Sequence, residues 1–304
     1  MVIQVAGGTG RKWYGGDRSL TVRMFITMAL LLVVYGVFLG ILYRAGASFI
    51  MMAVVAGVFV VGQFFFSDRL VLLTTGARIV SPEEAPELHD IIDRLAALAD
   101  LPKPRIAIID NQMANAFATG RNEKNAVVAV TTGLINQLER PELEAVLAHE
   151  LTHVKNHDMM VLTIASFLST VAFMIVRFSF WFGGRDRDRG SGGYVALAYI
   201  AAIVVWFVSM LLIRALSRYR EFAADRGSAI ITGQPANLSS ALLKMNGRMQ
   251  QIPERDLRDL QGANAFFVIP AARGNSFFEL FSTHPSLEKR LARLQQMAQE
   301  IEGK

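Results

Sequence analysis

The 304-residue chain contains no cysteine. It can form no disulfide framework, which suits a reducing compartment and argues against a small secreted scaffold. The same absence excludes cysteine nucleophiles and thiolate metal ligands. Histidine and the carboxylates remain as the side chains that could hold a metal ion.

Charge is also scarce. Charged residues make up 19% of the chain, below the ~25% usual for soluble domains, whereas 52% of its residues are hydrophobic and the mean hydropathy is +0.34. A single apolar run could be a buried core helix, but several runs of about 18–20 residues in so short a chain predict a multi-span membrane protein. Four runs have this character: Met24–Leu42, Phe49–Phe66, Met160–Phe182 and Tyr194–Ile213.

The most informative motif is H-E-x-x-H, which runs from His149 to His153 in a segment with helical apolar spacing. Residues i and i+4 share a helix face, so both imidazoles can bind one tetrahedral Zn²⁺ that keeps a water on its open side. Glu150 follows the first histidine, where its carboxylate can take a proton from that water. By chance the motif occurs in roughly one chain in a hundred of this size, so a solvated helix face with two histidines is the alternative.

A second helical segment offers the third ligand. Glu221 and Asp225 form an E-x-x-x-D pattern. Glu221 would complete a His₂Glu set, and Asp225, one turn further on, could accept the remaining N–H of a ligand histidine and fix its tautomer. Taken alone, Glu221 would be an ordinary helix-surface carboxylate, but beside H-E-x-x-H the ligand interpretation is favoured. His157 does not match the longer metzincin spacing, so we expect it at the surface or behind a ligand.

The motifs occur in an order that resembles the HtpX-type membrane metallopeptidases, distant relatives of the CAAX prenyl proteases. The resemblance covers nearly the whole chain from about Leu20 and leaves out the basic, Gly-rich tail Met1–Asp17. It rests on four segments: Asn115-Ala116-Phe117-Ala118-Thr119-Gly120, His149-Glu150-Leu151-Thr152-His153, Arg220-Glu221-Phe222-Ala223-Ala224-Asp225 and Ser282-Thr283-His284-Pro285.

The resemblance implies further roles. An edge strand formed by Asn115, Ala116, Phe117 and Ala118 would line the cleft and pair with an extended substrate through backbone hydrogen bonds. His284 would stabilise the negative charge that develops on the substrate's carbonyl oxygen. The alternatives are an ordinary strand and a histidine that merely precedes a helix. The resemblance also implies misfolded or damaged membrane proteins as substrates, and a role in stress response and protein quality control.

Basic residues predict the orientation in the membrane. They concentrate before the first run and after the second and fourth, which favours a cytoplasmic amino terminus, H-E-x-x-H helix and C-terminal region. The arginine-containing connector between the third and fourth runs is the weak exception. Two crossings separate His153 from Glu221 and return the chain to the same side, so the zinc-site hypothesis and the four-span topology agree. The net charge of +5 is best explained by anionic lipid headgroups, because no nucleic-acid motif is apparent.

Local patterns predict the remaining elements. Ser81 to Glu84 forms a capping box ahead of an amphipathic helix that runs to about Ala99. We assign the apolar stripe of the closing helix to packing. The other expected elements are strands at Arg105–Asp110 and Ala126–Thr131, the zinc helix from Pro141, helices at Leu216–Thr232 and Leu238–Met249, and the closing helix from Leu287.

The sequence thus predicts an α+β protein: a multi-span helical membrane protein with a zincin-like (gluzincin) cytoplasmic metallopeptidase domain that carries a small β-sheet. It would hold one Zn²⁺ per chain and cleave polypeptides at the cytoplasmic face of the inner or plasma membrane. A prenyl-protein processing protease and a non-catalytic membrane chaperone are the alternatives. The predicted parts are a cytoplasmic tail (1–22), a first transmembrane hairpin (23–66), the first part of the protease domain (67–159), a second hairpin (160–213) and the second part of the protease domain (214–304).

Overall fold

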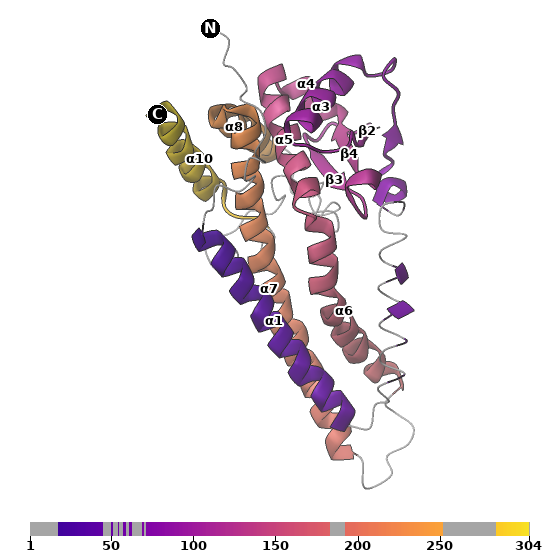
Figure 1. Cartoon of the computed structure of the whole chain (residues 1–304). Coiled ribbons are helices and arrows are strands. Elements are labelled where there is room, and N and C mark those ends of the chain that lie inside the picture. The colour runs from indigo at the N-terminus through magenta and orange to yellow at the C-terminus, as the bar shows by residue number, and fades with distance from the viewer. Residues whose placement is uncertain are drawn as a thin grey trace.

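The computed structural model describes residues 18–44, 71–182, 192–251 and 284–303, together with isolated positions between 50 and 69. The predicted second span therefore lies largely outside the described residues, as does most of the N-terminal tail. The described elements form a mixed α/β body with long helices extending from it (Figure 1). We call these two parts the head (71–157, 215–251 and 284–303) and the stalk (18–44, 158–182 and 192–214).

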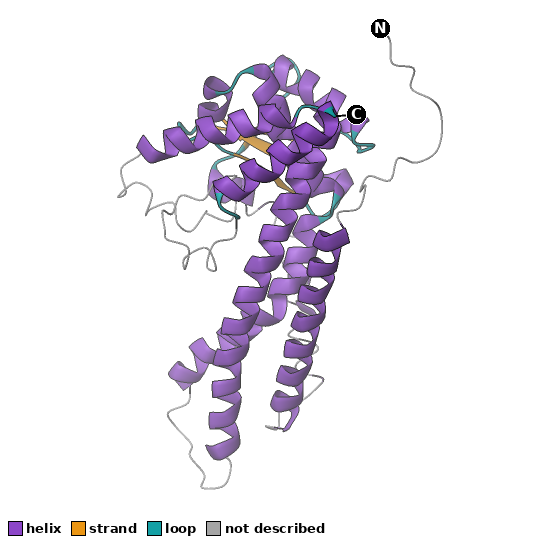
Figure 2. Cartoon of the chain, turned by 90° about the vertical axis from the view of Figure 1, so that its left-hand side faces the viewer, coloured by secondary structure: helices purple, strands orange, loops and turns teal. Residues whose placement is uncertain are grey.

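The stalk consists of α1 (Arg18–Arg44), α6 (Asp158–Phe182) and the first half of α7 (Gly192–Thr232), which extend together from one end of the head (Figure 2). Two of its helices, Ser19–Arg44 and Tyr199–Thr232, are long and apolar enough to cross a membrane, and α6 has a shorter apolar part. Three of the four predicted apolar spans are thus helices in the described residues.

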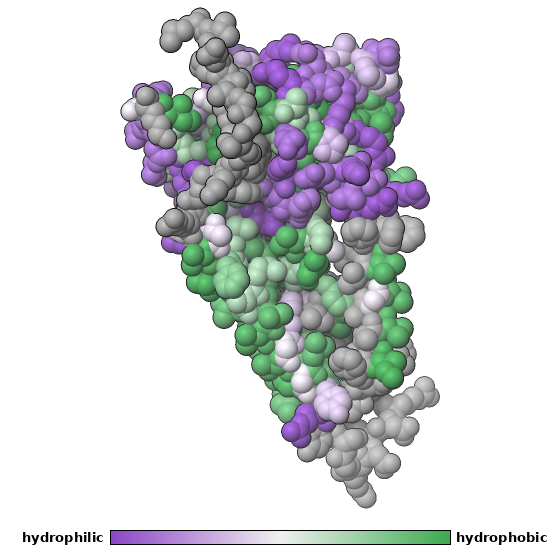
Figure 3. Space-filling view, in the orientation of Figure 1, coloured by the Kyte–Doolittle hydropathy of each residue, from purple (hydrophilic) through white to green (hydrophobic). Residues whose placement is uncertain are grey.

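Apolar side chains cover the outside of the stalk. Phe25 is 74% exposed, Leu32 is 76% exposed and Ile200 is 58% exposed, whereas the visible surface of the head is mostly hydrophilic (Figure 3). Among the described residues, a strip that includes Leu31 and Phe38 is buried where the stalk helices meet. An apolar surface of this extent would be unfavourable in water and fits a hydrocarbon solvent.

The head is built on a four-stranded sheet of order β1-β2-β4-β3, in which β2 and β4 are parallel and the outer pairings are antiparallel. The central strand β4 is buried along its whole length, which explains its continuous Val-rich sequence. β3 lies at an edge, as the resemblance implies for the segment from Asn115 to Ala118. The strands are β1 (Arg78–Ile79), β2 (Arg105–Ile109), β3 (Ala116–Thr119) and β4 (Val127–Thr131).

Helices pack on the sheet around one main core, which includes Ile91, Val128, Leu147 and Leu238. The predicted capping contact forms, because Glu84 Oε2 accepts from the Ser81 N–H at 2.9 Å. The helix itself begins only at Pro86, so this contact closes a turn ahead of it. The head helices are α3 (Pro86–Leu98), α4 (Thr132–Gln137), α5 (Arg140–Lys155), α8 (Pro235–Gln251) and α10 (Leu287–Glu302).

α7 is a single helix of 41 residues, whereas the sequence predicts a span that ends at Ile213 and a new helix from Leu216. Between Gly193 and Gly227 the chain has neither glycine nor proline, so nothing interrupts the helix at the boundary between stalk and head. By contrast, α5 and α6 are separated at His157, which has a φ of 54°.

α5 and the head half of α7 approach closely. A Cβ built on Gly227 would lie 2.3 Å from Thr152 Cγ2, so only glycine fits there. One residue on, Ser228 Oγ donates to the Ala145 carbonyl at 2.6 Å. This crossing brings the E-x-x-x-D segment of α7 against the H-E-x-x-H motif of α5.

Candidate metal centre

The three predicted ligands meet at this crossing. His149 and His153 lie one turn apart on α5, and Glu221 faces them from α7. The Nε2 atoms of the two histidines are 3.2 Å apart. Glu221 places Oε2 3.6 Å from His149 Nε2 and Oε1 3.4 Å from His153 Nε2. One ligand atom from each residue lies within 4.8 Å of the others.

These separations are compatible with a zinc site. Bonds of about 2.0–2.1 Å at tetrahedral angles place neighbouring ligand atoms about 3.3–3.4 Å apart. The two histidine Nε2 atoms are 3.2 Å apart, and each of them lies 3.4–3.6 Å from a different oxygen of the Glu221 carboxylate. His149 and Glu221 are buried and His153 is partly so. The donor set, two imidazoles and one carboxylate, leaves a fourth position for a water or a substrate.

The electrostatics of the cluster favour a positive charge. Burial lowers the pKa of His149, but the carboxylates of Asp225 and Glu221 outweigh burial and raise the pKa above its usual value. Burial also lowers the pKa of His153, and contact with Glu221 reverses this effect, so that its pKa is raised. The buried carboxylates thus stabilise a cation next to these imidazoles, a role that a divalent metal can take.

Asp225 lies behind His149, where the sequence predicts it. Its Oδ1 is 3.0 Å from His149 Nδ1. Arg290 of α10 donates to Asp225 through Nε at 2.9 Å and through Nη2 at 2.6 Å, and its Nη1 is 3.5 Å from Glu221 Oε2. Sequence reasoning missed Arg290. The available signal was an arginine three residues after Leu287, within the apolar stripe of the closing helix.

His153 also has an aspartate next to its Nδ1 atom. Its Nδ1 is 2.6 Å from Asp158 Oδ2, and Asp158 is ion-paired with Arg220 of α7. Arg220 occurs in one of the four motif segments, but the sequence analysis assigned a role to neither residue. His157 points away from the ligands: its side chain is 53% exposed and its Nε2 is 3.8 Å from Glu123 Oε1. It lies outside the ligand group, as its spacing predicts.

Glu150 connects α5 to the edge strand. Its Oε2 accepts from the Ala118 N–H at 2.9 Å, and burial raises the pKa of this carboxyl group. The Ala118 N–H is thus directed at α5 and away from β4. Residues two apart in a strand present their backbone groups to the same side, so the backbone groups of Ala116 also face away from β4, along an edge whose residues are buried.

The other two residues of the predicted substrate strand are placed differently. Asn115 is tied to the end of β4, because its N–H donates to Thr131 Oγ1 at 2.8 Å. Phe117 packs beside Val127 and Ala129, on the face of the sheet opposite to the main core. Of the four predicted residues, Ala116 and Ala118 therefore have backbone groups at the free edge.

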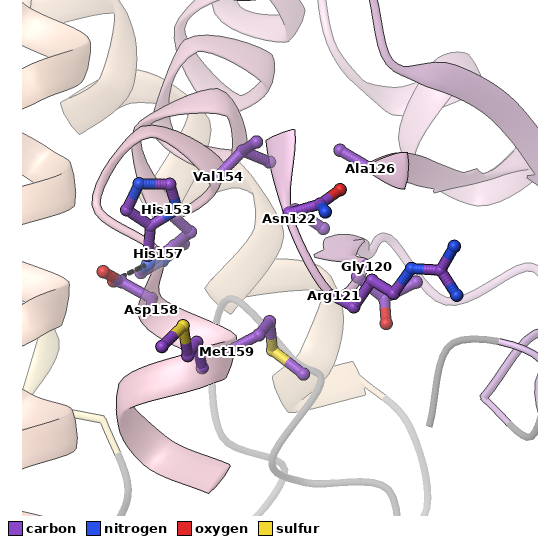
Figure 4. A pocket seen from close by; sticks show the side chains of 12 residues that line it. Gly120, Arg121, Asn122, Ala126, His153, Val154, His157, Asp158 and Met159 are labelled. Atoms are coloured by element: carbon purple, nitrogen blue, oxygen red, sulfur yellow. Dashed lines mark hydrogen bonds and ion pairs between the residues drawn. The ribbon is translucent and has the colours of Figure 1, made fainter. Parts of the chain in front are cut away.

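A pocket opens between the end of β3 and the junction of α5 with α6 (Figure 4). It reaches the predicted ligand His153 and its partner Asp158, so it adjoins the candidate metal centre. Its other walls are Ala118, Thr119, Gly120, Arg121, Asn122, Ala126, Val154, His157, Met159 and Met160.

His284 is also brought to the centre. It is 7% exposed, precedes α10, and places Nδ1 3.1 Å from Glu221 Oε2. The arrangement thus unites the predicted ligands, the predicted base and the predicted carbonyl-stabilising histidine around one buried point. Such a constellation is suited to metal-assisted hydrolysis of an acyl bond.

Comparison with known proteins supports this chemistry. Residues 82–298 match the model of peptidase family M48. A "Protease HtpX homolog" of Moorella thermoacetica is 59% identical over 295 residues, which cover 96% of this chain and 99% of the relative. "Protease HtpX homolog 1" of Streptomyces coelicolor is 48% identical, covering 95% of this chain and 96% of that protein.

A solved structure, the crystal structure of S. mikatae Ste24p, covers 91% of this chain with a TM-score of 0.55 at 20% identity. Our chain covers 67% of that protein, and at this identity the likeness shows the fold alone. The family predicted from the four motifs is confirmed. Because the family model matches most of the chain and the relatives match nearly its full length, the chain belongs to peptidase family M48 and is a membrane protease of the HtpX type.

Proposed function

We propose that the chain is a zinc-dependent endopeptidase whose metal is held by His149, His153 and Glu221. The observation that supports this proposal best is the convergence of these side chains: the two Nε2 atoms are 3.2 Å apart, and each lies 3.4–3.6 Å from an oxygen of the Glu221 carboxylate, close to the separations in a tetrahedral site. Bound zinc would supply Lewis acidity, polarising the substrate carbonyl and lowering the pKa of a water to about 7.

Glu150 would be the general base. It accepts the proton of the attacking water and passes it to the leaving amine. Its burial raises the pKa of the carboxyl group, which suits a group that must hold a proton between two steps. The hydrogen bond from Ala118 orients the carboxylate without contacting the metal ligands. His284 would donate to the carbonyl oxygen as negative charge develops there.

The free edge of β3 would bind the substrate. An extended peptide could pair with the backbone of Ala116 and continue past Ala118 toward the pocket beside His153. Such pairing uses main-chain groups, so it selects an extended conformation more than particular side chains. Unfolded segments of many proteins would meet this requirement.

The membrane arrangement in this proposal follows the sequence prediction. Both parts of the protease domain (67–159 and 214–304) and the tail (1–22) would face the cytoplasm, with hairpins at 23–66 and 160–213 in the inner or plasma membrane. Substrates would be misfolded or damaged membrane proteins, in a role of quality control and stress response. The stalk would hold the metal centre close to such substrates.

Metal content and proteolysis test the activity. The full chain, purified in detergent, should contain one zinc per chain and cleave an unfolded membrane protein. Cleavage should stop on chelation and return with added zinc. A chaperone would bind the unfolded protein without cutting it, and a prenyl-protein protease would cut a farnesylated peptide in preference to its unmodified form. Either result would replace the proposed function.

Cysteine labelling tests the topology, since the chain has no native cysteine. Under the four-span arrangement, Gly192→Cys at the start of α7 should react with an impermeant maleimide in intact cells. Glu87→Cys, on an exposed position of α3, should react only after lysis. Protection of position 192 in intact cells would refute the second hairpin and leave the metal-site proposal standing.

A further inference from the structure

We propose that Asp158 and Arg220 form a positioning pair that fixes the metal ligand His153. This inference rests on the proposed zinc site and adds two residues to its support. The pair links three elements: α5 carries His153, the first turn of α6 carries Asp158, and α7 carries Arg220 next to the third ligand.

The contacts place Asp158 behind the ligand. His153 Nδ1 lies 2.6 Å from Asp158 Oδ2, as the dashed line in Figure 4 shows. The other ring nitrogen, Nε2, faces His149 and Glu221. A carboxylate on Nδ1 places the ring proton there and leaves the Nε2 lone pair for the metal.

Arg220 holds Asp158 in turn. It pairs with the carboxylate of Asp158, and the two side chains are only 3% and 5% exposed. Its Nη2 also reaches the Asn156 carbonyl at 3.5 Å, within the turn that separates α5 from α6. One arginine thus contacts both the carboxylate and the turn that carries it. Because Arg220 directly precedes Glu221, a shift of α7 acts on the third ligand and on this support together.

The pair repeats the arrangement behind the other histidine. There, Asp225 lies 3.0 Å from His149 Nδ1 and receives two hydrogen bonds from Arg290. Each ligand histidine is therefore backed by an aspartate, and each aspartate by a buried arginine from a different helix. Arg290 comes from the carboxyl-terminal helix of the head, whereas Arg220 and Asp158 lie where the head joins the stalk.

Folding stability alone does not account for a buried pair of this kind. The desolvation of two charges offsets much of their attraction, and apolar replacements are often as stable. A carboxylate that also contacts a metal ligand has a second effect, because partners of this type typically change metal affinity by about 10- to 100-fold. This contact distinguishes Asp158 from Glu142, which is buried on α5 and pairs with Lys244 away from the metal centre.

Zinc affinity of the full chain in detergent, measured by competition with a chromogenic chelator, tests the inference. Asp158→Asn should weaken zinc binding about 10- to 100-fold. Glu142→Gln is the matched control: it removes a buried carboxylate charge from the first turn of α5, away from the predicted ligands, and should leave zinc affinity unchanged. With Co²⁺ in place of zinc, the visible absorption bands should shift in Asp158→Asn and stay unchanged in Glu142→Gln. Zinc affinity within twofold of wild type in Asp158→Asn would overturn the inference.

A double variant separates positioning from simple charge pairing. In Asp158→Asn/Arg220→Met no buried charge is left without a partner, so the fold should survive even where a single change perturbs it. If Asp158 acts on His153, the double variant should melt near wild type and still bind zinc weakly. Wild-type zinc affinity in the double variant would show that Asp158 and Arg220 form a structural ion pair with no effect on His153. If the wild-type protein itself bound no zinc, the proposed function would fail instead.

Discussion

The two halves of α7 differ in which side chains they bury: one half exposes apolar side chains, and the other buries acidic ones. In the stalk half, Leu197, Ile200 and Val204 are 54–58% exposed. In the head half, Glu221 and Asp225 are 5% and 2% exposed; Glu221 faces the predicted ligands His149 and His153, and Asp225 lies 3.0 Å from His149 Nδ1. A single uninterrupted helix thus presents apolar side chains to its surroundings at one end and encloses acidic ones at the other.

The difference shows what each half requires of its neighbours. The exposed apolar half is stable only if its solvent is hydrocarbon, and it needs few specific contacts. The buried acidic half is stable only if each charge finds a partner, so it depends on α5, α6 and α10. The effect of a substitution in the first half should depend on whether that half lies in lipid or in water. The effect of a substitution in the second half should depend on which individual contact is lost.

The largest effect is expected at the acidic end and its partner helix. Glu150→Gln should reduce the turnover number by about 10³-fold or more, because general acid–base catalysis is lost while the three ligands remain. Zinc content should stay near one per chain. Glu221→Ala should lose most of the zinc, because two histidines leave an open, weak site. Metal analysis together with a peptide-cleavage assay distinguishes the two variants. Normal turnover in Glu150→Gln would show that Glu150 is not the general base.

A matched pair of arginine substitutions compares the two halves directly. Ile200 in the stalk half is 58% exposed and Ile230 in the head half is 44% exposed. Ile200→Arg should oppose membrane integration by about 3 kcal/mol if that half meets lipid. Ile230→Arg should stay within about 0.5 kcal/mol, as exposed positions in water do. The membrane-integrated fraction and the melting temperature measure these effects. Equal tolerance of both changes would mean that the stalk half does not face lipid.

The close crossing of α5 and α7 predicts a smaller effect. Gly227→Ala should destabilise the head by about 1–3 kcal/mol, because the added methyl group overlaps Thr152. The double variant Gly227→Ala/Thr152→Ala should recover part of this loss. Gly40→Ala in α1 is the control, since nothing lies within 4 Å of a Cβ there. Calorimetry of these variants and of the single variant Thr152→Ala gives the coupling, and strictly additive losses would refute the overlap.

The smallest effect concerns Glu142. Burial raises its pKa, but hydrogen bonds from Lys244, Ser240 and the Glu139 N–H outweigh burial and lower the pKa below its usual value. A carboxyl group whose pKa is lower in the folded state contributes stability above its unfolded pKa of about 4.3, and this stability is lost as the pH falls through the folded pKa. Glu142→Gln should therefore cost about 1 kcal/mol at pH 7 and progressively less below pH 4. A pH-independent difference in the free energy of unfolding would contradict this assignment.

Sequence patterns predict the local parts of the centre well. The i, i+4 spacing sets His149 and His153 on one face, and the same spacing links Glu221 to Asp225. Such relations depend only on helix geometry. Strands β2 and β4 were also placed to within one residue at each end, because their Val- and Ile-rich runs are bounded by polar turns. The edge strand β3 was expected from the family resemblance, and the two-residue strand β1 was not predicted.

The unpredicted parts depend on how distant elements meet. Asp158 reaches His153 only because the chain turns at His157 with a positive φ, which no periodicity encodes. Arg290 reaches Asp225 only because α10 docks against α7. The continuity of α7 was missed because hydropathy marks where a helix leaves the membrane, and that point need not be where the helix ends.

The length of α7 gives the metal centre a mechanical connection to the bilayer. At a rise of 1.5 Å per residue, Glu221 lies about 14 Å from the midpoint of this helix. A tilt of about four degrees about that midpoint would carry the carboxylate about 1 Å. A membrane helix that is longer than the hydrocarbon core can accommodate a thinner bilayer by tilting, and a misplacement of 1 Å can reduce a reaction rate about 100-fold. A change in membrane thickness that tilted α7 relative to α5 would therefore move Glu221 relative to His149 and His153.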